Sequence, residues 1–187
     1  MLAMGLAAGA LLQPSAVRAQ EKTLVSGGID SGGFGAPVIK FSGVADEFGV
    51  FVGGRGGWII NSTFVIGGGG YGLANDIRFP MGQDDGPHRR LEFGYGGAEL
   101  EFIAMSDEVV HFTGLVLIGA GGLTFDRYED AVFVLEPSAN LELNIVRWCR
   151  LNFGAGYRFV SGVDHPDFTN SGMSAFFGQV TAKFGKF

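Results

Sequence analysis

Residues 131–160 are the most constraining part of the chain, because they form two consecutive runs that alternate between apolar and polar side chains. In the first run, Leu141 and Leu143 share one face while Glu136 and Glu142 share the other. Alternation with a period of two is the signature of a pleated strand. The second run repeats it, with an apolar face of Cys149, Leu151, Phe153, Ala155, Tyr157 and Phe159. The stretch therefore predicts a hairpin with one apolar and one charged face.

The register of this hairpin follows from the same alternation. A three-residue loop at 146–148 places Leu143 opposite Leu151 and Glu136 opposite Arg158. A two-residue loop would place apolar residues opposite polar ones, because a slip of one residue inverts every side chain. We expect the three-residue loop.

Two kinds of fold accommodate such a hairpin. A water-soluble sandwich or barrel buries the apolar face and exposes the charged one. A transmembrane barrel does the reverse, with apolar residues toward lipid and polar residues toward the lumen. The rest of the chain has to distinguish between them.

Residues 1–19 have the build of a secretory signal peptide, with an apolar run from Leu2 to Leu12 and small residues around Ala19. The run is too short for a transmembrane helix. Residues 20–33 are polar and rich in Gly and Ser, which predicts a flexible leader. The barrel domain is then expected over residues 34–187.

Composition excludes several classes of protein. Gly supplies 33 of 187 residues, yet 18 Phe argue against a disordered chain. A single cysteine, Cys149, excludes an internal disulfide framework. The net charge of -6 gives no basic surface for nucleic acid, which we do not expect as a partner.

Eight strands are predicted, at 35–43, 47–60, 63–74, 89–104, 109–124, 131–145, 149–160 and 173–186. Most are long enough to cross a bilayer when tilted, which takes about nine to eleven residues. The two longest connections, 75–88 and 161–172, are the third and the seventh, so an up-and-down barrel carries both at one end. The fold class predicted is all-β, an eight-stranded antiparallel up-and-down transmembrane barrel.

The less apolar strand faces supply a nearly neutral set of charges that we expect to pair in the lumen. The set comprises Lys40, Arg55, Glu99, Glu101, Glu136, Glu142, Arg150, Arg158 and Lys183. The opposite faces supply aromatics for two interfacial belts. These are Trp58, Phe102, Trp148 and Phe184 near the short turns, and Tyr71, Tyr157, Phe159 and Phe176 near the long connections.

Two segments fit the alternation poorly. In residues 53–72, Ile59 and Ile66 would point inward if Trp58 and Val65 point outward. Around Gly96 and Gly97 the apolar residues change phase, which predicts a β-bulge.

The signal peptide, the eight alternating strands and the final strand ending in Phe187 resemble the small bacterial outer-membrane β-barrel proteins, the class that includes the OmpA transmembrane domain and OmpX. The resemblance implies a bacterial outer-membrane location and contact with outer-membrane lipid. It also implies that the barrel assembly machinery recognises the terminal aromatic, Phe187, although Phe187 is out of phase with Val180, Ala182 and Phe184.

The leading functional hypothesis is a non-enzymatic outer-membrane barrel with a lumen filled by charged side chains and two long surface loops. Eight strands leave room for side chains but not for a general diffusion pore. The alternative is a soluble secreted or periplasmic lipocalin-like barrel that binds an apolar ligand. His111 has no Ser partner in register and His165 is followed by Pro166 and Asp167, so no catalytic site is found. The two long loops carry residues that could bind a divalent ion, but solvated loop polarity is the preferred interpretation, and no metal or cofactor is expected. These residues are Asp84, Asp85 and His88 in one loop and Asp164, His165 and Asp167 in the other. The loop partner is unspecified.

Overall fold

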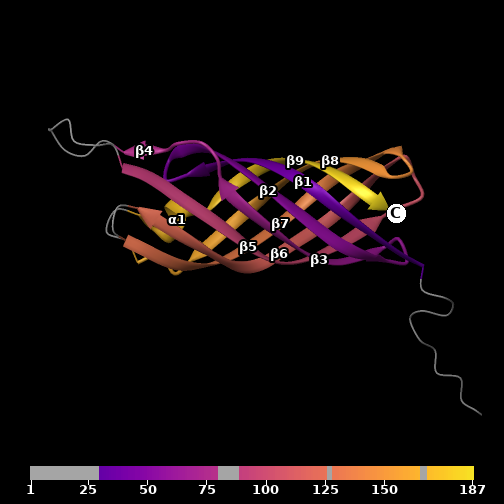
Figure 1. Cartoon of the computed structure of the whole chain (residues 1–187), viewed down its shortest axis with the longest axis horizontal. Helices are drawn as coiled ribbons and strands as arrows, with labels where there is room; N and C mark the ends of the chain where they lie inside the picture. Colours follow the sequence, from indigo (N-terminus) through magenta and orange to yellow (C-terminus); the bar gives the residue numbers. More distant parts are fainter. Residues whose placement is uncertain (1–29, 80–88, 126–127, 165–167) are drawn as a thin grey trace, which may run out of the picture.

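The computed structural model describes residues 30–79, 89–125, 128–164 and 168–187. These residues form an elongated barrel of long tilted strands (Figure 1). The strands are β1 (Ser31–Val44), β2 (Glu47–Ile60), β3 (Phe64–Leu73), β4 (Arg78–Phe79), β5 (Arg89–Ala104), β6 (Val110–Phe125), β7 (Tyr128–Val146), β8 (Cys149–Ser161) and β9 (Ala175–Lys186). One four-residue helix, α1 (Asn170–Met173), precedes β9. No helix among the described residues is long and apolar enough to cross a membrane.

The barrel is closed and runs up and down, as the alternation predicts. Each long strand pairs antiparallel with the next, β3 pairs directly with β5, and β1 pairs with β9. The two-residue β4 only extends the rim beside β5, so eight strands make the wall. The eight-stranded fold class is thus confirmed, while β4 and α1 were not predicted.

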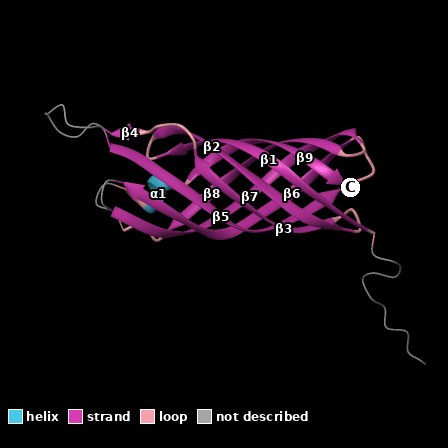
Figure 2. Ribbon diagram, in the orientation of Figure 1, coloured by secondary structure: helices cyan, strands magenta, loops and turns pink. Residues whose placement is uncertain are grey.

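The two ends of the barrel differ. One end of the barrel carries the connections that follow β1, β3, β6 and β8, together with β4 and α1 (Figures 1 and 2). We call this the loop end. The start of β1 and the end of β9 lie at the other, the turn end, with the short turns after β2, β5 and β7.

The turn between β7 and β8 keeps the predicted register with a different construction. Leu143 pairs with Leu151 and Leu141 with Phe153, as expected. The turn itself contains only Arg147 and Trp148, and the register shifts between Asn144 and Val146. A bulge thus supplies the extra residue that the alternation requires.

Two predictions of strand phase are wrong. No bulge occurs at Gly96 and Gly97, since β5 keeps one continuous register with both β3 and β6. The apparent change of phase arises because the inward face of β5 is apolar near the loop end and acidic further along. Val65 faces inward rather than outward, because it pairs with the buried Ile59 and paired residues share a face.

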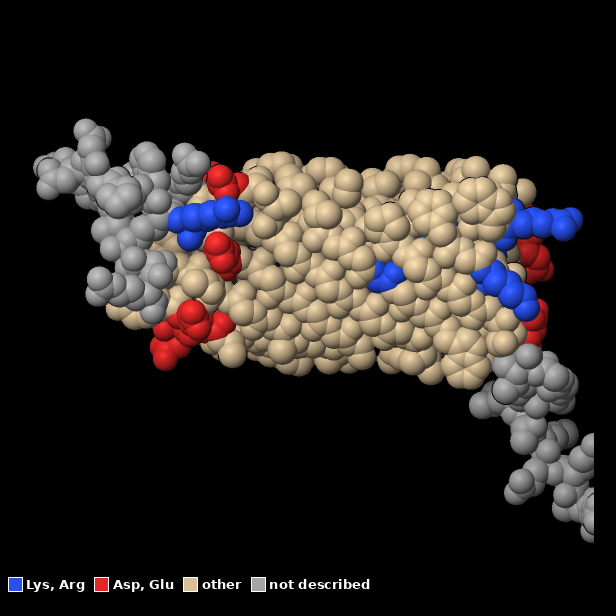
Figure 3. Space-filling model, in the orientation of Figure 1, with Lys and Arg blue, Asp and Glu red and all other residues tan. Residues whose placement is uncertain are grey.

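The face of the outer wall in Figure 3 is a broad band where little Lys or Arg surface shows between the other residues, and charged residues gather at both ends. Large apolar side chains remain exposed along this band, including Val52, Leu100, Phe112, Ile118 and Phe153. A soluble monomer rarely exposes a contiguous apolar surface of this extent. The wall therefore has the polarity of a barrel surrounded by lipid.

Inward-facing glycines let the wall curve sharply. Gly97 of β5 and Gly119 of β6 pair with each other, and a Cβ on either would lie 2.2 Å or less from a backbone oxygen of the neighbouring strand. Only glycine allows this approach. The glycine content is therefore partly explained by the closure of a small barrel.

Candidate functional site

The structure places all nine predicted lumen charges inside the barrel, each with at most 9% of its surface exposed. They come from six different strands, since alternate residues of each strand face the lumen. Eight of the nine form ion pairs with one another, and Arg158 is the exception among the described residues. The interior is therefore the feature that most distinguishes this barrel.

The larger ion-pair cluster lies in the turn-end half. Arg55 of β2 donates from Nε to Glu99 Oε2 at 2.6 Å and from Nη2 to Glu101 Oε2 at 2.9 Å, both on β5. Lys183 Nζ of β9 lies 2.8 Å from Glu101 Oε1 and 2.5 Å from Glu142 Oε2. Lys183 thereby joins a carboxylate of β5, which lies across the lumen from β9, to a carboxylate of β7.

Glu142 of β7 collects further partners from its own side. Arg150 Nη1 donates to Glu142 Oε1 at 3.1 Å, and His111 Nε2 lies 3.2 Å from the same oxygen. Asn152 Nδ2 donates to Oε2 at 3.3 Å. Multiple charge-assisted hydrogen bonds are what allow a carboxylate to remain ionised when it is fully buried.

A second cluster lies closer to the middle of the lumen. Lys40 of β1 forms an ion pair with Glu136 of β7, and Tyr95 donates to the other oxygen of Glu136 at 2.6 Å. Lys40 Nζ also lies 3.4 Å from the centroid of the Tyr71 ring, a cation–π contact. Tyr71 donates to Glu99 at 2.6 Å and so connects the two clusters.

Arg158 has no carboxylate partner among the described residues. The sequence placed it opposite Glu136, but its Nε donates to the main-chain oxygen of Met173 at 3.1 Å and its Nη2 to that of Gly43 at 2.8 Å. Its guanidinium carbon lies 4.7 Å from the centre of the Phe51 ring. Arg158 therefore ties the segment around α1 to the barrel interior.

A cluster of buried apolar side chains fills the lumen at the loop end. Phe51, Leu91 and Phe93 project from the wall, and Phe168 and Met173 enter from the connection before β9. Met173 is fully buried, and Phe168 packs edge-on against Phe125 with ring centres 5.1 Å apart. The cluster closes this end.

The turn end has a smaller apolar cluster. Phe34, Ile59, Val65 and Ile103 are buried together, with the half-buried Phe187 packed against them. The Phe187 ring stacks on Phe34 at 6.3 Å and lies 4.1 Å from the guanidinium carbon of Arg150. Phe187 thus lies at the mouth of the lumen, in keeping with its being out of phase with the lipid-facing residues of β9.

The predicted belt aromatics face outward with one exception. Exposed side chains are Trp58, Phe102, Trp148, Phe159, Phe176 and Phe184, and Tyr157 is half-buried. On the outer surface at the turn end, the rings of Trp148 and Phe184 stack with their centres 6.1 Å apart. At the loop end, the rings of Tyr157 and Phe176 pack with their centres 4.8 Å apart. Tyr71 is the exception: it is 4% exposed and faces the lumen, because it shares the phase of Val65.

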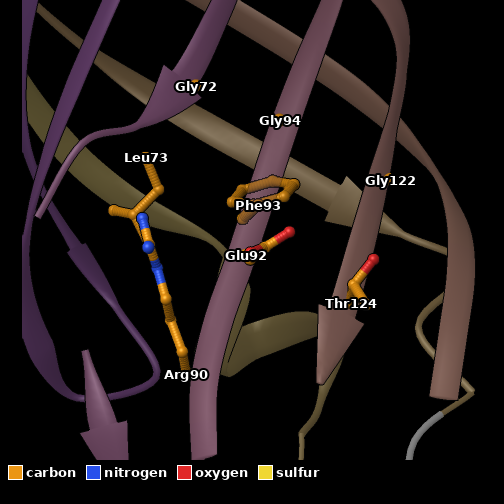
Figure 4. A pocket seen from close by; sticks show the side chains of 8 residues that line it. All are labelled: Gly72, Leu73, Arg90, Glu92, Phe93, Gly94, Gly122 and Thr124. Atoms are coloured by element: carbon orange, nitrogen blue, oxygen red, sulfur yellow. The ribbon is translucent and has the colours of Figure 1, made fainter. Parts of the chain in front are cut away.

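The outer wall carries a hollow of about 530 Å³ near the loop end (Figure 4). Its floor is made by Gly72, Gly94 and Gly122, which are paired across β3, β5 and β6. Arg90 and Glu92 lie at its charged edge, and Arg90 Nε is 3.0 Å from Asp76.

Several interior residues were not identified from the sequence. Tyr95 and Asn152 share the inward phase of predicted lumen charges on β5 and β8, and His111 alternates with Val110 and Phe112 on β6, so alternation could have found all three. Phe168 lies in a connection with no periodic pattern and gave no such signal, and Met173, predicted as the first residue of the last strand, lies instead at the end of α1. The described residues hold no group of three His, Cys, Asp or Glu side chains placed to bind a metal ion. Of the loop residues considered as ligands, 84, 85, 88, 165 and 167 lie outside the described part of the chain.

No family model matches the chain, and no curated protein matches its sequence. Solved structures do match its fold. Neisserial surface protein A matches with a TM-score of 0.57 and 12% identity over 86% of this chain and 99% of its own. The N-terminal barrel domain of Pseudomonas aeruginosa OprF matches with a TM-score of 0.56 and 8% identity over 84% and 99%. Ail, the attachment invasion locus protein of Yersinia pestis, in complex with the heparin analogue sucrose octasulfate, gives 0.51 and 14% over 83% and 97%. The chain therefore shares the fold of the small outer-membrane barrels.

Proposed function

We propose that this protein is an integral barrel of the bacterial outer membrane, without enzymatic activity, which acts through surface interactions at its rim. The observation that carries the proposal is the inverted polarity of the wall. Nine charged side chains are buried inside, eight of them in ion pairs, while large apolar side chains such as Leu100, Phe112 and Phe153 are exposed on the outside. That arrangement is stable in lipid and unfavourable in water.

The lipocalin-like alternative needs the opposite arrangement. A soluble barrel for an apolar ligand would direct its apolar faces inward and its Glu and Arg residues outward. Here the lumen holds two ion-pair clusters between two apolar clusters, which leaves no large apolar chamber among the described residues. We therefore do not favour it.

A general diffusion pore is also not proposed. Side chains block the axis at three levels: the cluster around Phe51 and Met173, the ion pairs around Lys183, and the cluster around Phe34. An eight-stranded barrel has an interior about wide enough for side chains alone. We expect no sustained conductance from the intact protein in a planar bilayer.

The function then resides at the rim, and we infer that the loop end is the interacting surface. The exposed connections are where binding residues concentrate on a rigid scaffold. Among the side chains that the structure describes, the loop-end rim is acidic, with Asp46, Glu47, Asp76, Glu92, Glu129, Asp130 and Asp164 against Arg90. This charge favours a cationic or neutral partner over a polyanion. Residues 80–88 and 165–167 of the long connections lie outside the described residues.

The experiment that tests the proposal is electrophoresis of detergent-extracted membrane fractions with and without boiling. We expect the protein in the outer-membrane fraction, with a band that shifts on heating because a closed barrel resists unfolding in detergent. A protein that is soluble without detergent and shows no shift would overturn the proposal.

A further inference from the structure

We propose that the turn end of the lumen contains a binding site for a phosphate group. The site is a cleft of about 460 Å³ lined by Asn144, Val146, Arg147, Arg150, Lys186 and Phe187, from the ends of β7, β8 and β9. Its volume lies within the range of about 300–1,000 Å³ typical of small-molecule sites. It is independent of the loop-end interactions proposed above.

The cleft has an excess of positive charge. Arg147 and Lys186 are exposed, and neither forms an ion pair with another described residue. Arg150 is mostly buried, and its partner Glu142 is shared with Lys183. Asp107 and Glu108 are exposed at the same end of the barrel, but neither lines the cleft. Two cations of the cleft therefore lack a carboxylate among the described residues.

A phosphate monoester matches this charge better than a single carboxylate. It carries a charge of about −1.5 to −2 at neutral pH, close to the two uncompensated cations. Guanidinium groups, as in Arg147 and Arg150, bind phosphate oxygens in a bidentate geometry. The Phe187 ring, 4.1 Å from the Arg150 guanidinium carbon, holds that group in place at the cleft.

A second polar feature specifies what lies beside the phosphate. Asn144 Nδ2 donates to the main-chain oxygen of Glu108 at 2.8 Å, but the Asn144 Oδ1 atom is buried and accepts no hydrogen bond from a described residue. A buried acceptor without a donor is costly. With the Asn144 side chain turned so that Oδ1 faces the cleft, a ligand with an ammonium or hydroxyl group next to its phosphate would supply that donor. Free phosphoethanolamine, a phosphate monoester, has this chemistry. The same group in a lipid headgroup is a phosphodiester with a single negative charge, but it keeps the ammonium group and the phosphate oxygens.

The direct test uses the tryptophan beside Arg147 as a reporter. The chain has two tryptophans, so Trp58→Phe leaves Trp148 alone. In a maltoside detergent, which carries no phosphate, we expect phosphoethanolamine and inorganic phosphate to change its fluorescence saturably. Sodium chloride at equal ionic strength should not. An equal response to chloride, or no saturable response to either phosphate compound, would overturn the proposal.

Charge variants localise the site. Arg147→Gln and Lys186→Gln should each weaken binding about tenfold, the effect of losing one charge-assisted hydrogen bond. Arg90→Gln, an equal change of charge at the loop end, should leave it unaffected. All three side chains are exposed, and retention of the heat-dependent electrophoretic shift verifies the fold. Equal weakening by all three substitutions would mean nonspecific attraction and would contradict the site.

Native mass spectrometry separates two sources of the phosphate. After purification from phosphatidylethanolamine nanodiscs, a lipid headgroup site retains a phospholipid that the double variant Arg147→Gln, Lys186→Gln loses. A site for a free ligand retains none but still binds added phosphoethanolamine in nanodiscs. If the unsubstituted protein retains no phospholipid and also binds no added phosphoethanolamine, the proposal is refuted.

Discussion

Substitution of Lys183 by methionine tests whether the ion-pair network stabilises the barrel. Lys183 is 1% exposed, and its Nζ lies within 2.8 Å of carboxylate oxygens of both Glu101 and Glu142. Lys183→Met keeps the apolar stem but removes the cation that joins these carboxylates. Both would remain buried, at 2% exposure or less, with one cation fewer.

Loss of one partner of a buried ion pair costs about 3–5 kcal/mol, because the other charge stays buried and uncompensated. Here the cost should fall near the lower limit. Glu101 keeps Arg55 at 2.9 Å and Glu142 keeps Arg150 at 3.1 Å. We expect a loss of about 3 kcal/mol in the free energy of unfolding, roughly a hundredfold in the unfolding equilibrium.

The assay is urea unfolding of the protein in lipid vesicles, followed by tryptophan fluorescence and by the heat-dependent electrophoretic shift. The matched control is Lys186→Met, three residues further along the chain, which is exposed and should change stability by less than about 0.5 kcal/mol. Adding Glu142→Gln to Lys183→Met should restore part of the loss, since it neutralises one uncompensated carboxylate. A Lys183→Met variant as stable as the control, or a double variant no more stable than the single one, would refute the reasoning.

Three further substitutions test other parts of the structure. Gly119→Ala should destabilise the barrel by about 1–3 kcal/mol in the same assay, because the new Cβ meets a backbone oxygen at 2.0 Å, whereas Gly122→Ala on the same strand meets nothing within 4 Å and should have little effect. Tyr71→Phe should cost about 1–3 kcal/mol by removing the hydrogen bond to a buried carboxylate, and a neutral result would contradict its inward placement. Arg158→Met should accelerate amide hydrogen exchange at Met173 and its neighbours, since it removes the donor that holds that main chain, and unchanged exchange would argue against this role.

The strands and the polarity of the wall could be predicted because both depend on local alternation. The boundaries expected at 47–60 and 89–104 coincide with β2 and β5. A barrel in lipid needs apolar residues outside and polar residues inside, so each strand carries the requirement in its own sequence. The phase of β3 could not be read this way. Its glycines at 67–70 carry no polarity, and the inward placement of Tyr71 follows only from the pairing of Val65 with Ile59.

Most partners of the lumen charges could not be predicted, because all but one of the ion pairs among these charges join strands that are not neighbours in the sheet; the exception is Arg150 of β8 with Glu142 of β7. Lys40 on β1 reaches Glu136 on β7, and Lys183 on β9 reaches Glu101 on β5. Hairpin register places Arg158 opposite Glu136, but it does not determine which long side chain crosses the lumen. Which partner each charge reaches depends on the closed shape of the barrel and on the side chains that fill its two ends.

The two long connections contribute unequally to that closed shape. The connection before β9 is built into the interior, since Met173 is fully buried, Ala45 donates its main-chain N–H to Gly172, and Arg158 binds Met173 from within. The connection after β3 adds the buried Ile77 and the two ladder pairs of β4 at the rim. The cross-lumen ion pairs join residues of the wall strands and include no residue of either connection. Sequence change at the loop end is then constrained most around α1, where the lumen and the surface share the same residues.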